Sequence, residues 1–148
     1  MTTKQSYFQF YLRLALSISF LLPGLDRLGV WGPHGKPWVS WGDWAHFSAF
    51  ARQVMGFLPA GLANVLAVLA TIGEIGCGVL LLIGFFTRQA AVISGVLTLG
   101  FALSMWISFG VTAPFSYSVF TVSAASFLLS TLPEYKWSVD GLRAAKRN

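Results

Sequence analysis

Residues 61–86 form an almost entirely apolar run of the sequence, and Glu74 is its only charged residue. A helix rises about 1.5 Å per residue, so this run reaches about 39 Å and can cross a hydrocarbon layer of about 30 Å with some tilt. Glu74 lies at the midpoint of the run, where a carboxyl group that faces lipid costs a few kcal/mol or more. The run therefore predicts a membrane-spanning helix whose single acid is sheltered by its neighbours.

Small residues surround Glu74 on the surface of this predicted helix. At 100° per residue, four small residues fall within about 60° of it: Ala67, Ala70, Thr71 and Gly78. Small side chains let a second helix approach closely, so we expect Glu74 to point into a helix bundle. The acid has two open interpretations, an ion, proton or quinone site on the one hand and a structural acid satisfied by a hydroxyl group or an Arg on the other.

The composition extends the membrane interpretation to the whole chain. Of its 148 residues, 55% are hydrophobic and only 10% are charged, whereas about 25% of the residues of a soluble domain are charged. This length suits one domain, residues 1–148. The net charge of +5 does not predict a nucleic-acid partner, because four of the ten basic residues gather in the last thirteen positions, where they suit membrane orientation better.

The cysteine and histidine residues exclude several cofactor chemistries. Cys77 is the only thiol, so an intramolecular disulfide and a dithiol relay are both impossible. His34 and His46 lie outside the apolar runs, which excludes a haem held by two helical histidines. Asp43 and His46 could touch one metal ion, but two ligands do not make a site. We therefore expect no metal centre and no intrinsic cofactor.

Four apolar segments predict an all-α, four-helix membrane bundle: residues 8–25, 61–86, 89–109 and 114–132. Arg13 lies close to the start of the first segment, so its side chain is expected to extend to the interface rather than to pair with Glu74. The short link Thr87-Arg88 makes the second and third segments antiparallel neighbours. In the third segment the predicted packing stripe consists of small residues: Ser94, Gly95, Thr98 and Ala102.

The long connection between the first two spans predicts an additional helix over residues 41–57. Its apolar residues recur at helical spacing, but the segment is too short and too polar to cross a membrane, so we expect an amphipathic interfacial helix. Four of the six tryptophans lie in this connection: Trp31, Trp38, Trp41 and Trp44. Two interpretations of them remain open, an aromatic belt at headgroup level and a lid over a planar ligand.

The positions of the basic residues predict the orientation in the membrane. Four spans place both termini on one side, which then carries most of the basic residues: Lys4, Arg88, Lys136, Arg143, Lys146 and Arg147. The other side carries only three: Arg27, Lys36 and Arg52. Because basic residues favour the cytoplasmic side, the N- and C-termini are predicted to be cytoplasmic and the tryptophan-rich connection external.

Several short motifs, taken in order, resemble the DoxX family of small four-helix membrane proteins. They are Arg13, Phe20 and Gly24-Leu25-Asp26-Arg27-Leu28 in the first span, then Glu74-Ile75-Gly76, Gly78-Val79-Leu80-Leu81-Leu82, Gly84, Thr87-Arg88 and Ala90-Ala91. The resemblance covers residues 11–132. The chain departs from the common pattern in Arg27, where Lys is more usual, and in its longer, tryptophan-rich first connection.

This resemblance implies a bacterial or archaeal protein of the cytoplasmic membrane that is often linked to redox or sulfur metabolism. The family includes the DoxD-type subunit of thiosulfate:quinone oxidoreductase. Our first hypothesis is therefore a small membrane subunit of a respiratory or sulfur-linked oxidoreductase that interacts with quinone and receives electrons from a partner subunit. Its candidate ligands are quinone and membrane lipid.

The first hypothesis assigns provisional roles to six residues. Glu74 is the candidate proton relay, Arg13 or Arg88 would polarise a quinone oxygen, and Trp41 or Trp44 would stack on the ring. Asp26 joins them as a candidate quinone-binding residue. Two rival functions stay open, a non-catalytic assembly or scaffold subunit of a larger complex and a proton-coupled carrier of small solutes, although no inverted repeat supports the carrier. The expected protein partners are other subunits of the complex or further copies of the same chain in a homo-oligomer.

Overall fold

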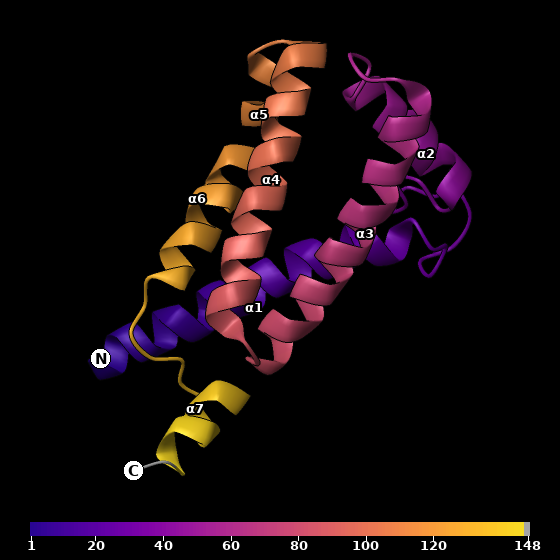
Figure 1. Ribbon diagram of the computed structural model, residues 1–148. Coiled ribbons are helices and arrows are strands. Elements are labelled where there is room, and N and C mark those ends of the chain that lie inside the picture. The colour runs from indigo at the N-terminus through magenta and orange to yellow at the C-terminus, as the bar shows by residue number, and fades with distance from the viewer. Residues whose placement is uncertain (147–148) are drawn as a thin grey trace.

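The computed structural model describes residues 1–146, and these fold entirely into helices and connections, without a strand (Figure 1). Arg147, which was counted for the orientation, lies outside the described residues. The helices are α1 (Thr3–Asp26), α2 (Trp44–Val54), α3 (Ala60–Ile83), α4 (Thr87–Phe109), α5 (Thr112–Ser116), α6 (Val119–Ser130) and α7 (Val139–Ala145). The predicted all-α class is confirmed, and α1, α3 and α4 are each long and apolar enough to cross a membrane.

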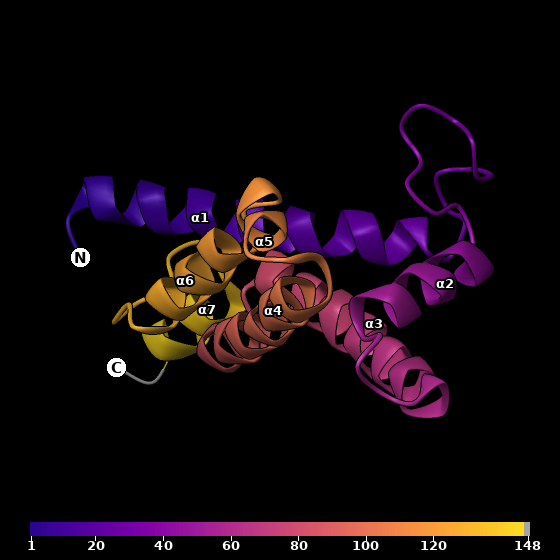
Figure 2. The ribbon, with the colours of Figure 1, turned by 90° about the horizontal axis from the view of Figure 1, so that it is seen from above.

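Helix α1 packs against α3 through small residues on both helices. The hydroxyl of Ser17 donates a hydrogen bond of 2.7 Å to the carbonyl oxygen of Gly78. A Cβ atom on Gly24 would lie 2.6 Å from the side chain of Ile75, so the glycine permits this close approach. In Figures 1 and 2, α1 runs across the α3–α4 hairpin at a steep angle. As a result, the end of α1 meets the middle of α3.

The hairpin of α3 and α4 forms as the sequence predicts. Helix α3 ends at Gly84, which adopts the left-handed conformation that favours glycine (φ 68°), and α4 begins at Thr87. The predicted packing stripe is confirmed, since Ser94, Gly95, Thr98 and Ala102 are all buried. The start of α1 and helix α7 lie at the same end of the molecule as the α3–α4 turn (Figure 1), while the side of the membrane on which they lie stays a prediction.

The fourth predicted span, residues 114–132, is not a continuous helix. The chain forms the short α5 and then α6, and Ser118 between them has a positive φ of 55°. The 12 residues of α6 rise only about 18 Å, less than a hydrocarbon layer. The prediction of one continuous helix over residues 114–132 is therefore wrong, and a fourth full span is not confirmed. The segment is rich in serine hydroxyls, which compete with the helix for backbone groups.

Helix α6 nevertheless completes the bundle by packing against α4. The Ser123 hydroxyl donates to the carbonyl oxygen of Gly95 at 2.8 Å. A Cβ atom on Gly95 would lie 2.8 Å from the ring of Phe127. The segment after α6 then folds back over α1 and the α3–α4 turn.

Helix α2 is shorter than the predicted 41–57 and begins after Asp43, whose carboxylate accepts the backbone N–H of His46 at 2.8 Å. This hydrogen bond lowers the pKa of Asp43, and the imidazole of His46 lowers it further. The buried face of α2 comprises Phe47, Ser48, Ala51 and Val54. This face packs against α3 and α4, and the location of α2 at a membrane surface stays a prediction.

Candidate functional site

The charge pair of Arg27 and Glu74 links the end of α1 to α3. Nη2 of Arg27 lies 2.7 Å from Oε2 of Glu74, and the two side chains are 7% and 16% exposed. At this distance the guanidinium and the carboxylate form a close ion pair. The sequence-based expectation that Glu74 faces the inside of the bundle is confirmed.

Thr71, one turn before Glu74, fixes the position of the guanidinium. Nη1 of Arg27 donates to the Thr71 hydroxyl at 2.9 Å. The hydroxyl in turn donates to the carbonyl oxygen of Ala67 at 2.9 Å. The small face of α3 therefore supplies both the charge partner and a hydrogen-bond acceptor for Arg27.

Aromatic rings cover the other side of the same guanidinium. Its Cζ lies 3.9 Å from the ring centroid of Phe47 and 5.2 Å from that of Trp41, distances at which a cation is attracted to an aromatic face. Asp26 holds Trp41 in place, because its Oδ2 accepts the backbone N–H groups of Ser40 and Trp41 at 3.1 and 2.8 Å. The connection is thereby folded over the end of α1.

A cavity of about 310 Å³ lies between α2, α3 and α4, with Arg27 and Glu74 in its wall. Apart from these two residues and Ser104, the lining is apolar or glycine: Phe47, Ala51, Val54, Met55, Leu66, Ala67, Leu69, Ala70, Val96, Leu97, Gly100 and Phe101. A volume of this size is at the lower end of small-molecule sites, which are mostly apolar with a few convergent polar groups. The cavity thus offers one cation and one acid to a ligand that is otherwise apolar.

Three of the six residues proposed from the sequence gather around Arg27. Glu74 pairs with it, Trp41 packs on it, and Asp26 precedes it in the chain and organises the connection. Only Glu74 lines the cavity between α2, α3 and α4, whereas Asp26 and Trp41 line a separate cavity at the end of α1.

The other three proposed residues lie away from Glu74. Arg13 is 1% exposed, and its Nη2 donates to the carbonyl oxygen of Trp137. The expectation that Arg13 extends to the interface is therefore wrong, because the segment after α6 covers it. Arg88 is exposed beside the α3–α4 turn and donates to the carbonyl oxygen of Leu132 at 3.3 Å. Trp44 contacts the ring of Phe47 and lines neither cavity.

Sequence reasoning did not place Arg27 in the site, although it noted the residue in the motif of the first span. Because Arg27 follows the last residue of α1, the sequence alone indicates only a solvated helix end at this position. The signal that points to it is the requirement of a lone membrane acid for a cation. Arg13 lies near the start of the first span and Arg27 follows its end, and choosing between them requires the angle at which α1 crosses α3.

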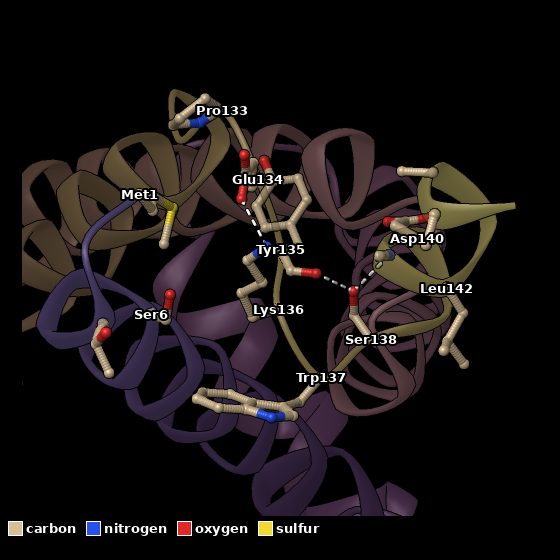
Figure 3. A pocket seen from close by; sticks show the side chains of 14 residues that line it. Met1, Ser6, Pro133, Glu134, Tyr135, Lys136, Trp137, Ser138, Asp140 and Leu142 are labelled. Carbon is tan, nitrogen blue, oxygen red and sulfur yellow. Dashed lines mark hydrogen bonds and ion pairs between the residues drawn. The ribbon is translucent and has the colours of Figure 1, made fainter. Parts of the chain in front are cut away.

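A larger cavity, of about 960 Å³, lies between the start of the chain and the segment after α6, and Figure 3 shows its lining. Its charged side chains already have partners. Lys136 pairs with Glu134 at 3.0 Å and lowers the pKa of that carboxyl group, while Asp140 accepts the backbone N–H groups of Phe86 and Thr87. We therefore place the candidate site at Arg27 and Glu74.

No group of three or more potential metal-ligating His, Cys, Asp or Glu side chains occurs within residues 1–146. The stacked rings of His34 and His46 lie 3.8 Å apart at the surface, where His46 also contacts Asp43. In two stacked imidazoles the nitrogen lone pairs lie in nearly parallel planes and do not converge on one point. This pair is therefore not arranged around a common ion.

Comparison with known proteins agrees with the resemblance seen in the sequence. The DoxX family model matches residues 8–107, more than half of the 148 residues, and this range contains both Arg27 and Glu74. No curated protein and no solved structure matches the chain. With its three apolar helices of membrane-spanning length, the chain is a membrane protein and belongs to the DoxX family.

Proposed function

We propose that this protein is a small membrane subunit of an oxidoreductase and that it binds quinone in the cavity between α2, α3 and α4. The observation that carries the proposal is the ion pair of Arg27 and Glu74 in the wall of an otherwise apolar cavity of about 310 Å³. A quinone combines an apolar ring and tail with two carbonyl oxygens, so it matches both parts of this lining. In the cell we place the protein in the cytoplasmic membrane of a bacterium or archaeon, with cytoplasmic termini.

The two charged residues have separate roles in this proposal. Reduction of a quinone to a quinol takes up two electrons and two protons, and the electrons come from a partner subunit. Arg27 donates a hydrogen bond to a quinone oxygen and stabilises the negative charge that the electrons bring. Glu74, a carboxylate in the ion pair, takes up a proton from the aqueous side and passes it to the nearer reduced oxygen, and the second proton reaches the other oxygen from the aqueous side.

Filling the cavity tests the binding step. Gly100 lines the cavity, and a Cβ atom added there meets nothing within 4 Å. The Cβ atom of Gly100→Leu is therefore accommodated without a clash, and we expect the rest of its side chain to occupy part of the cavity. Gly76→Leu is the matched control, because Gly76 on α3 is equally open and does not line the cavity.

The measurement is a titration of detergent-solubilised protein with decylubiquinone, followed by quenching of tryptophan fluorescence. We expect Gly100→Leu to weaken binding at least tenfold and Gly76→Leu to bind like the wild type. Equal affinity of Gly100→Leu and the wild type would overturn the proposed site.

The kinetic test replaces the acid. Glu74→Gln keeps the shape of the side chain and removes its proton transfer, so quinone-dependent turnover of the purified assembly should fall at least tenfold per assembled complex. Turnover unchanged per complex would exclude the relay.

A non-catalytic subunit is the second candidate, because Arg27 joins α1 to α3 through both Glu74 and Thr71 and such a link can be purely structural. That function predicts that Glu74→Gln lowers the yield of assembled complex and leaves the turnover of each complex intact. Copurification from mildly solubilised membranes identifies the partner subunits that either function needs.

A further inference from the structure

A second cavity, of about 440 Å³, opens at the end of α1 under the connection to α2. Three of its lining residues are tryptophans, Trp31, Trp38 and Trp41, and the others are Leu22, Pro23, Asp26 and Ser40. Figure 2 shows this connection looping outward from the end of α1. Neither the candidate quinone site nor the cavity of about 960 Å³ shares any of these lining residues.

Asp26 is a buried acid with one unused oxygen in this cavity. The residue is only 4% exposed. Its Oδ2 accepts the backbone N–H groups of Ser40 and Trp41, whereas its Oδ1 is buried and has no hydrogen-bond partner. Since buried carboxylate oxygens are normally satisfied, the orphaned Oδ1 calls for an additional partner.

The cation that follows Asp26 in the chain is shared with a second acid. Arg27 attracts Asp26, but its guanidinium is paired with Glu74. One cation and two acids therefore meet at the end of α1, with a net charge of −1. A positively charged ligand in the cavity would complete the balance.

The tryptophans are the best aromatic partners for such a cation. Trp31 is held in place because its indole N–H donates to the carbonyl oxygen of Leu22 at 2.9 Å. Trp38 already attracts a cation of the chain itself, since Nζ of Lys36 lies 5.7 Å from its ring centroid. A ligand with a more weakly hydrated ammonium group would compete with this exposed lysine for the aromatic wall.

We propose that this cavity binds the ammonium or alkylated ammonium group of a small organic cation, with the three tryptophans as its wall and Asp26 as its counter-ion. The same group occurs in a phospholipid headgroup and in a free solute. The site is independent of quinone binding, which uses a different cavity.

Choline chloride is the first probe, titrated into the detergent-solubilised protein with calorimetric detection. The control ligand is 3,3-dimethyl-1-butanol, which has the same shape without the charge. We expect choline to bind at least tenfold more tightly than the alcohol. Equal binding of the two, or no binding of choline in detergent together with no headgroup preference in nanodiscs, would overturn the proposal.

Three variants locate the site. Trp38→Ala removes an exposed wall residue, and we expect it to weaken choline binding roughly fivefold to thirtyfold. Asp26→Asn keeps an acceptor for the N–H groups of Ser40 and Trp41 and should weaken binding at least tenfold. Trp106→Ala is the matched control, because this exposed tryptophan lies on α4, contacts the ring of Phe120 and does not line the cavity. Should Asp26→Asn fail to fold, Trp38→Ala decides, and wild-type affinity in that variant would refute the site.

Nanodiscs distinguish the two sources of the ammonium group. If the natural ligand is a lipid, discs of phosphatidylcholine or phosphatidylethanolamine should block choline binding, whereas discs of phosphatidylglycerol should permit it. Choline binding in all three discs identifies a free solute. Decylubiquinone affinity should be unchanged in Trp38→Ala, so failure of this proposal is distinguishable from failure of the quinone site.

Discussion

Arg27 at the end of α1 and Glu74 in α3 form a largely buried ion pair of 2.7 Å, and Thr71 binds the same guanidinium. Two charges that are withdrawn from water depend on each other, because removing one leaves the other uncompensated. This dependence connects the stability of the bundle to the acid that we propose as the proton relay.

Replacing either member of the pair should therefore destabilise the protein more than replacing both. We expect Arg27→Met and Glu74→Met each to lower the free energy of unfolding by about 3 kcal/mol, and the double variant to recover a large part of that loss. Thermal unfolding in detergent measures the effect, with the exposed Arg88→Ala as control. A double variant as unstable as the sum of the singles would contradict the coupling.

The contact between α4 and α6 predicts a position-specific effect of glycine substitution. A Cβ atom on Gly95 would lie 2.8 Å from the ring of Phe127, whereas one on Gly76 meets nothing within 4 Å. Gly95→Val should therefore cost about 1–3 kcal/mol through overpacking, and Gly76→Val should not. The two variants are compared by denaturant unfolding in the same detergent, and equal stabilities would show that α4 and α6 do not pack closely here.

The segment after α6 should be held in place by Asp140. Its carboxylate accepts the backbone N–H groups of Phe86 and Thr87 at 3.1 and 2.7 Å, in the first turn of α4. Asp140→Ala should cost about 1 kcal/mol and accelerate hydrogen exchange at these two amides. Leu142→Ala is the control, because this side chain is 68% exposed. Unchanged exchange in Asp140→Ala would mean that α4 does not need this cap.

Tyr135 predicts a loss of stability at alkaline pH. Burial raises the pKa of its phenol, and its hydroxyl donates to the carbonyl oxygen of Leu129 at 3.2 Å. A raised native pKa means that the folded state holds the proton more tightly than the unfolded state does. The stabilisation is complete below the unfolded value of about 10 and is lost as the pH rises through the native value.

This loss should follow the phenol itself. Between about pH 9 and pH 12, the stability of the wild type should fall more steeply than that of Tyr135→Phe, because phenylalanine has no titrating group at this position. The fluorescence of Trp137, two residues away, reports on the same segment. Parallel pH profiles of the two proteins would refute the assignment.

The sequence was sufficient to predict the individual helices wherever composition alone decides their form. The apolar runs predicted α1, α3 and α4, and the short link before Gln89 predicted the hairpin. The small residues around Gly95 correctly predicted the buried stripe of α4. At α6 the prediction of a continuous helix was wrong. The break at Ser118 depends on a local backbone conformation that serine can adopt but that its presence in a sequence does not predict.

The sequence by itself also determined that Glu74 must be sheltered and left its partner open between a ligand, a hydroxyl group and an Arg, because a lone charge in hydrocarbon is costly. Only the tertiary structure decided that this cation is Arg27 and that Arg13 is covered by Trp137 instead. Periodicity specifies which face of a helix is buried, but the angle and offset between two helices depend on how both surfaces interlock. Here the contacts of Gly24 with Ile75 and of Ser17 with Gly78 set that crossing, and the crossing brings the end of α1 to the middle of α3.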